Sequence, residues 1–342
     1  MNEISEFLQN ALGISTSQLD LIPRRNANNA LYKVTADNGD TFAVKLFAGT
    51  SPQDRDRFDR EAAALAFFKY HAVQHVPYAI AVDAKLHLIV YPWIDGPPSV
   101  EVNADFVIHA WRFIESLHAL RTSQDATVLP KATEACLCID ALVKQISDRL
   151  ARLNNNDVLE PEMLAPLLPR IKAQLDAIIA DAAPRIQALQ GLEDGSIARH
   201  LQTLSPSDFG THNAILSDSG PVFIDFEYFG WDDPVKLCAD FMWHPGMNLG
   251  GELRELARRE AVRIFSADET FPYRLRLLYP LYGLRWSLII LNPFAPERWD
   301  RMYDAGERRS RDDVLKHRVE SASKFLDAVE APIDEWISNC PT

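Results

Sequence analysis

The chain of 342 residues is 47% hydrophobic and 24% charged, a composition that supports a core of normal size and excludes disorder throughout the sequence. Its net charge of −13 argues against a nucleic-acid partner and against an anionic membrane surface, because both are bound through clustered Lys and Arg. The sequence lacks the basic and apolar regions of a signal peptide, an apolar run of about 18 residues and zinc-site cysteine spacing, so we expect a cytoplasmic protein.

The first part of the sequence is typical of a small sheet with helices. We expect helices at residues 4–12 and 54–70, where apolar positions recur at helical spacing. We expect strands at residues 19–24, 30–36, 41–47, 77–82 and 86–93. The Asn38-Gly39 pair is a hairpin signal between two of these strands, and the run at 95–98 interrupts the pattern.

The remaining sequence is mainly helical. The expected helices cover residues 105–120, 137–153, 163–189, 253–265, 273–291 and 308–329. Short strands are expected between residues 199 and 229. This order predicts an α+β fold with a β-rich N-lobe at residues 1–95 and a mainly helical C-lobe at residues 96–342.

Lys45 is the sole charged residue of the apolar strand expected at 41–47. A buried lysine is costly unless it is paired. Glu61 follows 16 residues later, among small apolar residues on the next helix, and a Lys45–Glu61 pair would leave the ammonium group directed at phosphates. Taken alone, the motif is explained equally well by a lysine on an edge strand whose side chain reaches water.

The strongest chemical signal is a loop rich in Pro, Ser and Gly that is followed by an apolar strand. Asp208 and Asn213 lie five residues apart in this loop, and Asp225 ends the strand, where a charge is otherwise unwelcome. Two carboxylates and an amide suit a hard cation with oxygen ligands. Turn chemistry alone would explain Asp208 and Asn213, but the strand that ends in Asp225 favours a metal site.

These motifs resemble those of the aminoglycoside phosphotransferase and choline kinase family, which carries H-G-D-x-x-x-x-N followed by I-D-[WF]-E. The resemblance implies a protein-kinase-like bilobal fold, with a small β-rich N-lobe and a large, mainly helical C-lobe. It implies that Asp208 positions or deprotonates the acceptor hydroxyl, and that Asn213 and Asp225 hold Mg²⁺. It also implies that Lys45 contacts the α- and β-phosphates and that Glu61 is its helix partner.

Further stretches resemble the family in order along about two-thirds of the chain. Asn29 begins a stretch similar to the end of the family's nucleotide loop. Tyr91 and Trp93 belong to a stretch that resembles the linker strand whose backbone meets adenine. The resemblance implies a kinase that transfers the γ-phosphoryl group of Mg-ATP, with GTP as the other donor left open. The resemblance also implies that the acceptor is a small molecule, with the hydroxyl of an amino sugar, a sugar or an amino alcohol receiving the phosphoryl group, and that its site lies in the C-lobe.

The chain departs from the family pattern at two positions. Pro206-Ser207 stands where the family has His-Gly, and Arg25-Asn26 stands where the nucleotide loop usually has a glycine pair. Glycine allows the backbone to approach phosphate closely, so side chains are expected to make these contacts here: Arg24, Arg25, Asn28 or Asn29. The departures favour an alternative, a catalytically weakened pseudokinase that acts as a nucleotide- or partner-binding module. The complete set of five catalytic, phosphate and metal residues favours an active kinase.

The segment that follows the metal aspartate is rich in aromatic and acidic residues. In the resembling family this region borders the acceptor pocket. Trp231 and Trp243, with Asp232 and Asp233, could hold an ammonium group or a sugar ring. The same residues are explained equally well by core packing and by a cap on the next helix. His212, inside the catalytic loop, is expected to be structural.

Overall fold

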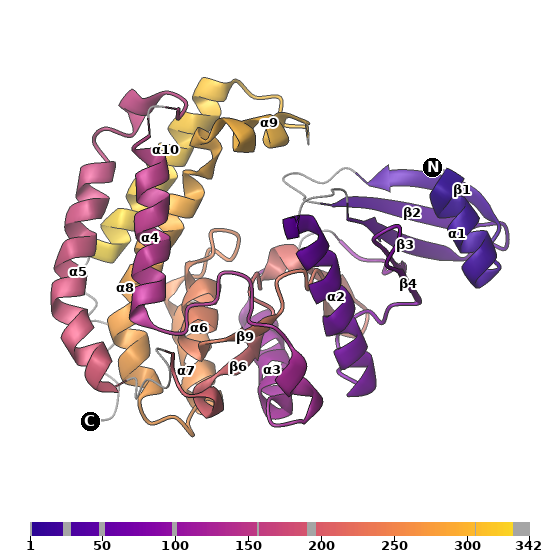
Figure 1. The fold of residues 1–342 in the computed structure, drawn as a ribbon, viewed down its shortest axis with the longest axis horizontal. Coiled ribbons are helices and arrows are strands. Elements are labelled where there is room, and N and C mark those ends of the chain that lie inside the picture. Colours follow the sequence, from indigo (N-terminus) through magenta and orange to yellow (C-terminus); the bar gives the residue numbers. More distant parts are fainter. Residues whose placement is uncertain are drawn as a thin grey trace. The chain divides into compact units, whose positions relative to one another are not determined.

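The structure is a computed structural model, and it describes residues 2–22, 29–47, 52–97, 101–155, 157–189, 196–304 and 306–330. The chain divides into two compact units (Figure 1). Unit 1 consists of Met1–Glu101, Ala119–Thr133 and Pro206–Gly230, and unit 2 consists of Val102–His118, Glu134–Ser205 and Trp231–Thr342. The lobes predicted at 1–95 and 96–342 stay a prediction. Among the described helices, none is long and apolar enough to cross a membrane.

A five-stranded antiparallel sheet forms the centre of unit 1. Its strands are β1 (Thr16–Ile22), β2 (Ala30–Ala36), β3 (Thr41–Leu46), β4 (Ala81–Asp83) and β5 (Leu88–Pro92). The strand order β1-β2-β3-β5-β4 makes β3 a central strand, and Lys45 lies opposite Leu31 on one side and Ile89 on the other. The hairpin between β2 and β3 turns at Gly39, whose φ of +87° glycine adopts without steric cost.

Two helices cover this sheet. Helix α1 (Asn2–Leu12) packs Ile4 and Leu8 into a core with Val34, Val44, Leu88 and Val90. Helix α2 (Pro52–Tyr70) contributes Phe58, whose ring lies 5.6 Å from that of Phe47 at the end of β3. Because both helices bury apolar side chains against β3 and its neighbours, the strand that carries Lys45 is held firmly.

The rest of unit 1 is a loop and a hairpin from the middle of the chain, with the short helices η1 (Asp125–Val128) and η4 (Thr211–Asn213). Strands β7 (Ala214–Ser217) and β8 (Gly220–Phe223) pair antiparallel, with Ala214 opposite Phe223. This register brings the residue before β7 close to the residue after β8, and the amide of Ile224 donates to the carbonyl of Asn213 at 3.0 Å. The hairpin therefore joins the two predicted metal-binding segments.

Unit 2 is mainly helical. Its elements are α3 (Ala104–Leu120), α4 (Ile139–Leu153), η2 (Pro161–Met163), α5 (Leu168–Leu189), η3 (Arg199–Leu201), β6 (Thr203–Ser205), β9 (Gly230–Asp232), α6 (Pro234–Trp243), α7 (Gly251–Ile264), α8 (Phe271–Ile290), η5 (Asn292–Phe294), α9 (Pro296–Asp304) and α10 (Arg311–Glu330). Helix α8 contacts α4, α5, α6 and α10 and is buried along most of its length. A methyl group at Gly283 would collide with Val329 and Trp243, so glycine permits this close packing. The predicted α+β fold class is confirmed.

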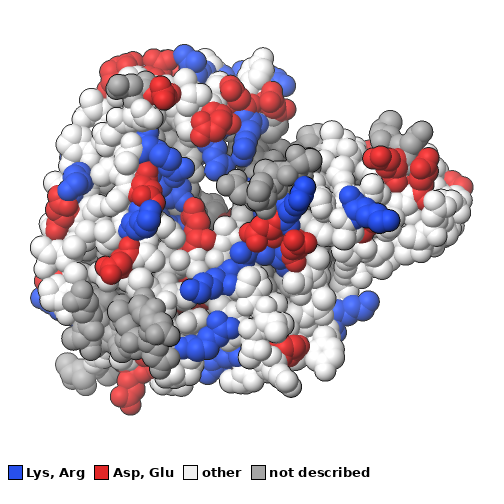
Figure 2. Space-filling view, viewed as in Figure 1, with Lys and Arg blue, Asp and Glu red and all other residues white. Residues whose placement is uncertain are grey.

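The acidic net charge does not form one continuous patch on the face drawn in Figure 2, where Lys and Arg lie among Asp and Glu. Many of these charges are paired along helices. Lys144 lies 2.6 Å from Asp148 on α4, and Lys172 contacts Asp176 on α5. Exposed pairs of this kind contribute little to stability, so the surface charge is consistent with a general solubilising role.

Candidate active site

The ammonium group of Lys45 is the centre of the candidate site. Lys45 is 4% exposed on the central strand β3, which excludes the alternative of a water-seeking lysine on an edge strand. Its Nζ donates to Oε2 of Glu61 on α2 and, at 2.7 Å, to Oδ1 of Asp225 after β8. Oε2 of Glu227 lies 3.6 Å away. Carboxylates from two distant segments therefore converge on one lysine.

These carboxylates decide the charge of Lys45. Burial alone would lower the pKa of the lysine, but Asp225, Glu61 and Glu227 outweigh it and hold the pKa above the ordinary value. Tyr91 contacts the carboxylate of the Lys45–Glu61 pair: its hydroxyl donates to Oε1 of Glu61 at 2.5 Å. Burial and the Glu61 carboxylate raise the pKa of Tyr91, so the hydroxyl keeps its proton and its donor role.

Asp225 adopts an unusual backbone conformation. Its φ is +67°, in the left-handed region, and its side chain is 16% exposed next to a buried lysine. Aspartate and asparagine tolerate this region better than other residues with a side chain. Residues in sparsely populated conformations cluster at functional sites, where the surrounding structure holds them.

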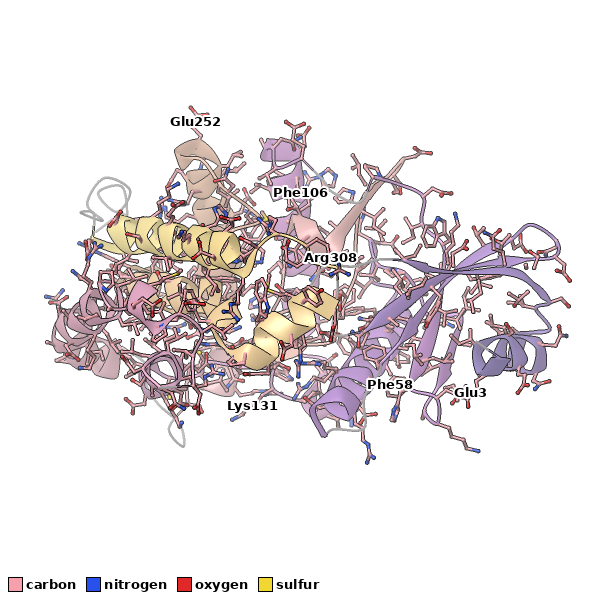
Figure 3. The ribbon with its side chains drawn as sticks, turned by 90° about the horizontal axis from the view of Figure 1, so that it is seen from above. Glu3, Phe58, Phe106, Lys131, Glu252 and Arg308 are labelled. Atoms are coloured by element: carbon pink, nitrogen blue, oxygen red, sulfur yellow. The ribbon has the colours of Figure 1, made fainter. Side chains whose placement is uncertain are left out.

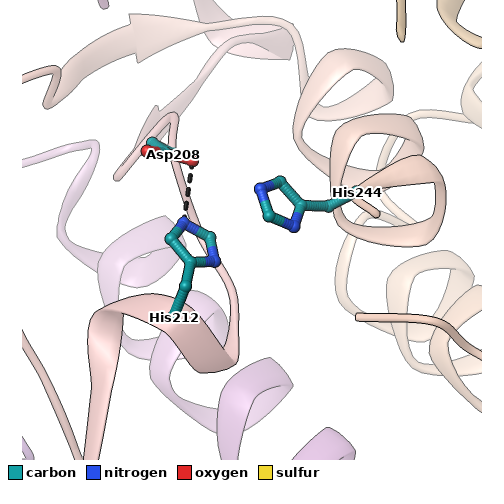
Figure 4. A group of neighbouring side chains, drawn as sticks. All are labelled: Asp208, His212 and His244. Atoms are coloured by element: carbon teal, nitrogen blue, oxygen red, sulfur yellow. Dashed lines mark hydrogen bonds and ion pairs between the residues drawn. The ribbon is translucent and has the colours of Figure 1, made fainter. Parts of the chain in front are cut away.

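Asp208 and Asn213 lie in the loop before β7. Nδ2 of Asn213 donates to the backbone carbonyl of Asp208 at 3.0 Å, and Asn213 is buried. The Asp208 side chain is 39% exposed, and its Oδ1 lies 3.0 Å from Nε2 of His212 (Figure 4). Ser207 precedes it with a φ of +69°, at the position where the resembling family has glycine. The loop thus presents one carboxylate to solvent with a histidine beside it.

Glu227 belongs to the site, and the sequence analysis gave it no role although it lies within the matched motif. Its Oε2 accepts from Nδ2 of Asn29, and its Oε1 lies 3.9 Å from Nε of Arg57. Carboxylate oxygens of Glu61, Asp225 and Glu227 all lie within 4.8 Å of one another, which makes them one of the candidate metal-binding groups among the described residues. An all-oxygen, anionic donor set fits Mg²⁺ and does not suit a soft metal.

Some predicted nucleotide residues lie elsewhere or outside the described residues. The Trp93 side chain contacts other residues: its Nε1 donates to Oδ1 of Asp95 at 2.9 Å, and Nζ of Lys33 lies 4.4 Å from the centre of its ring. Its backbone amide donates to the carbonyl of Thr41. The described residues do not include Arg24, Arg25, Asn26 and Asn28. The phosphate contacts expected of Arg24, Arg25 and Asn28 therefore stay predictions.

The aromatic and acidic segment after the site is engaged within unit 2. Trp231 and Trp243 are 2% and 5% exposed, and the guanidinium of Arg199 lies 3.3 Å from the centre of the Trp231 ring. Asp233 accepts from the amide of Val235 at the start of α6, which is the expected helix cap. Of the two interpretations left open by the sequence, the structural one therefore holds for these groups.

The fold has close counterparts among solved structures. A spectinomycin phosphotransferase in complex with ADP and spectinomycin matches with a TM-score of 0.62 at 13% identity, over 96% of this chain and 98% of that chain. A choline kinase from Streptococcus pneumoniae matches with a TM-score of 0.57 at 14% identity, over 96% and 98%. An amicoumacin kinase in complex with AMP-PNP, Ca²⁺ and Ami matches with a TM-score of 0.55 at 13% identity, over 96% and 93%. These likenesses show the fold and confirm that it is kinase-like.

Two sequence comparisons gave different outcomes. The comparison with individual curated proteins gave no match. The profile of the phosphotransferase enzyme family matches residues 21–271, a span that contains every predicted site residue. The chain therefore belongs to the phosphotransferase enzyme family, as the resemblance to aminoglycoside phosphotransferases and choline kinases predicted.

Proposed function

We propose that this protein is an active kinase that transfers the γ-phosphoryl group of Mg-ATP to a hydroxyl of an amino sugar, a sugar or an amino alcohol. The observation that carries the proposal is the convergence of Glu61, Asp225 and Glu227 on the buried Lys45. Among the described residues, three carboxylates face Lys45 and, at 3.9 Å from Glu227, Arg57, and this excess of negative charge supports binding of a further cation. The bound molecules of two structural counterparts, ADP with spectinomycin and AMP-PNP with Ca²⁺, support a nucleotide donor.

Each site residue has a proposed role. Glu61 and Tyr91 hold Lys45 in place, so that its ammonium group can bind phosphate oxygens without reorganising. Asn213 and Asp225 would hold Mg²⁺, which screens the charge of the transferring phosphoryl group. Glu227 adds a carboxylate beside them and anchors Asn29. The backbone of the strand end with Tyr91 and Trp93 would meet the adenine ring.

Asp208 is the proposed catalytic residue. Its partly exposed carboxylate can accept the proton of an acceptor hydroxyl and align the oxygen for attack. His212, at 3.0 Å, restrains the carboxylate. In this proposal residues 1–95 bind the nucleotide, and residues 96–342 supply the catalytic loop and the acceptor site of a cytoplasmic enzyme.

Thermal unfolding tests the proposal. ATP at about 100 times its dissociation constant stabilises a binding protein by about 2.7 kcal/mol, and we expect this shift to require Mg²⁺. Asp225→Asn should abolish the Mg²⁺-dependent shift. Asp218→Asn removes the same charge from the exposed turn of the same hairpin and should leave the shift intact, which makes it the matched control.

The outcomes separate the two functions. A Mg²⁺-dependent shift followed by ADP release with one of a panel of aminoglycosides, sugars and amino alcohols would establish the kinase. A shift without ADP release for any acceptor would favour the pseudokinase that binds nucleotide. No shift with either ATP or GTP would refute the nucleotide site itself.

A further inference from the structure

A short segment that is distant in sequence contacts the helix and the loops that carry the candidate site residues. Residues 130–133, here called the strap, follow η1 in the stretch Ala119–Thr133, which belongs to unit 1 although α3 before it and α4 after it belong to unit 2. Lys131, in the strap, and Phe58, on α2, are labelled in Figure 3. The segment carries none of the predicted site residues, so the proposed function leaves it unexplained.

On one side the strap is bonded to α2. Nη1 of Arg60 donates to the backbone carbonyl of Lys131. The guanidinium is oriented by Asp56, whose Oδ2 lies 2.7 Å from Nε of Arg60 one turn earlier on the helix. Arg60 directly precedes Glu61, the partner of Lys45. The strap therefore holds α2 at the residue next to the site carboxylate.

On the other side the strap is bonded to the loop that follows Glu227. The amide of Thr133 donates to the carbonyl of Tyr228 at 3.1 Å. At Gly230 the two backbones are so close that a Cβ atom would lie 2.5 Å from both the amide nitrogen of Ala132 and the carbonyl oxygen of Pro130. A glycine is required there for lack of space, and any other residue must displace the strap.

A third, longer contact reaches the catalytic loop. Oγ of Ser207 donates to the carbonyl of Thr133 at 3.4 Å, directly before Asp208. The backbone of Thr133 thus bonds two loops at once, through its amide and its carbonyl. Each of these contacts falls one to three residues from a proposed site residue: Glu61, Asp208 or Glu227.

We propose that the strap is a positioning element, and that Arg60 and Gly230 are positioning residues that act through it on Glu61, Asp208 and Glu227. Loops are mobile unless they are bonded to a rigid scaffold, and side chains that react must be held closely in place. The strap supplies this restraint by fixing two loops to a helix. Its consequence for catalysis rests on the proposed function, whereas its mechanical role does not.

Hydrogen exchange tests the mechanical role in the protein without ligand. Arg60→Ala removes the bond to the strap, and we expect the Thr133 and Phe229 amides, which donate to Tyr228 and Phe226, to exchange at least about tenfold faster. Arg55→Ala is the matched control, because it removes an exposed arginine from the same helix and leaves Arg60 and Asp56 in place. Unchanged exchange in Arg60→Ala would overturn the proposal, whether or not the protein is a kinase.

A double-mutant cycle tests the consequence for catalysis. We expect Arg60→Ala to lower kcat/KM for Mg-ATP in ADP release about tenfold, because displacement of a positioned group by about 1 Å can cost up to a hundredfold. Arg60→Lys should recover part of the rate. Gly230→Ala, which acts on the opposite side of the strap, should add little to Arg60→Ala, since both changes release the same element.

The cycle has two decisive outcomes. Additive losses of catalytic rate from Arg60→Ala and Gly230→Ala would show that the two residues act separately. This result would overturn the proposal that both act through the strap. If the wild-type protein neither binds nor hydrolyses nucleotide, the proposed function fails instead. Hydrogen exchange alone then tests whether the strap positions the two loops. If Gly230→Ala does not fold, Ser207→Ala replaces it, because it removes a weaker contact with the same segment.

Discussion

Among the described residues, the two buried lysines lie in different units, and comparing them shows how the proposed site differs from a structural ion-pair network. Lys236 on α6 is 1% exposed, and its Nζ lies 3.0 Å from Asp232 and 3.2 Å from Asp240. Burial alone would lower the pKa of Lys236, and the two carboxylates raise it above the ordinary value. Lys45 is subject to the same opposing effects.

The two lysines differ in where their partners come from and in the balance of charge. The partners of Lys236 lie one turn before and after it in the sequence. Its network is completed by Arg285, which contacts Asp240 and Glu134. Arg149 also pairs with Glu134, so cations and carboxylates balance. Among the described residues around Lys45, three carboxylates face two cations, Lys45 and Arg57. We therefore expect a buried lysine to mark a cation site only where carboxylates exceed cations.

The largest expected effect distinguishes Asp208, the proposed catalytic residue, from the residues of these ion pairs. Asp208→Asn should lower turnover by about 10³-fold, because loss of a proton acceptor typically costs 10² to 10⁴. Binding of Mg-ATP should persist, because Asp208 lies outside the Lys45 cluster and its carboxylate contacts His212. Single-turnover ADP release and the thermal shift measure the two quantities. Full turnover in this variant would remove the assigned role of Asp208.

The second prediction contrasts the two lysines. Lys236→Met should lower the free energy of unfolding by about 3–5 kcal/mol, because it removes the lysine paired with the buried Asp232 carboxylate. Mg²⁺ should not restore this loss, since Asp232 is fully buried. In Lys45→Met the remaining carboxylates include the partly exposed Asp225, so Mg²⁺ alone should recover part of the stability.

Denaturant unfolding with and without Mg²⁺ checks this contrast, and the wild type provides the baseline for ion effects on folding. Equal responses of Lys236→Met and Lys45→Met to Mg²⁺ would contradict it. In that case the excess of carboxylates around Lys45 would not be a cation site.

The sequence predicted the parts of the site that depend on local pattern. An apolar strand with one lysine and a helix with one inward glutamate are both periodic signals, so Lys45 and Glu61 could be paired from the sequence. Asp225 lies 180 positions from Lys45, and local pattern did not place them together. The resemblance to a family implied that Lys45 contacts the phosphates and that Asp225 holds Mg²⁺, but the direct contact between them was not predicted.

Other features had weaker signals or none. Tyr91 was assigned to the linker through its backbone, whereas its side chain contacts Glu61. The register could have shown this, because Ile89 lies opposite Lys45 and Tyr91 is two residues further along the same strand face. The helices α6 and α9 were not among the expected helices. Each begins with a proline and is too short to give a clear periodic pattern. The strap has no periodicity and could not be recognised from sequence.

The third prediction concerns the unliganded protein. Asp225→Asn removes one of three carboxylates around Lys45, and asparagine tolerates the left-handed backbone, so the free energy of unfolding should change by less than about 1 kcal/mol. Asp240→Asn removes an anion from a balanced network and should cost about 3 kcal/mol. Denaturant titration without nucleotide measures both. A larger loss in Asp225→Asn than in Asp240→Asn would reverse the proposed distinction between the two clusters.

The smallest expected effect concerns the departure from the family pattern at Ser207. Its φ of +69° lies where a residue with a side chain is strained by about 1–2 kcal/mol, and glycine offsets part of that gain by its greater freedom in the unfolded chain. Ser207→Gly should therefore be more stable than Ser207→Ala by about 1 kcal/mol, a difference of a few degrees in Tm. Both variants lose the hydroxyl bonded to Thr133, so their difference isolates the backbone. Equal melting temperatures would show that the loop carries no strain at this residue.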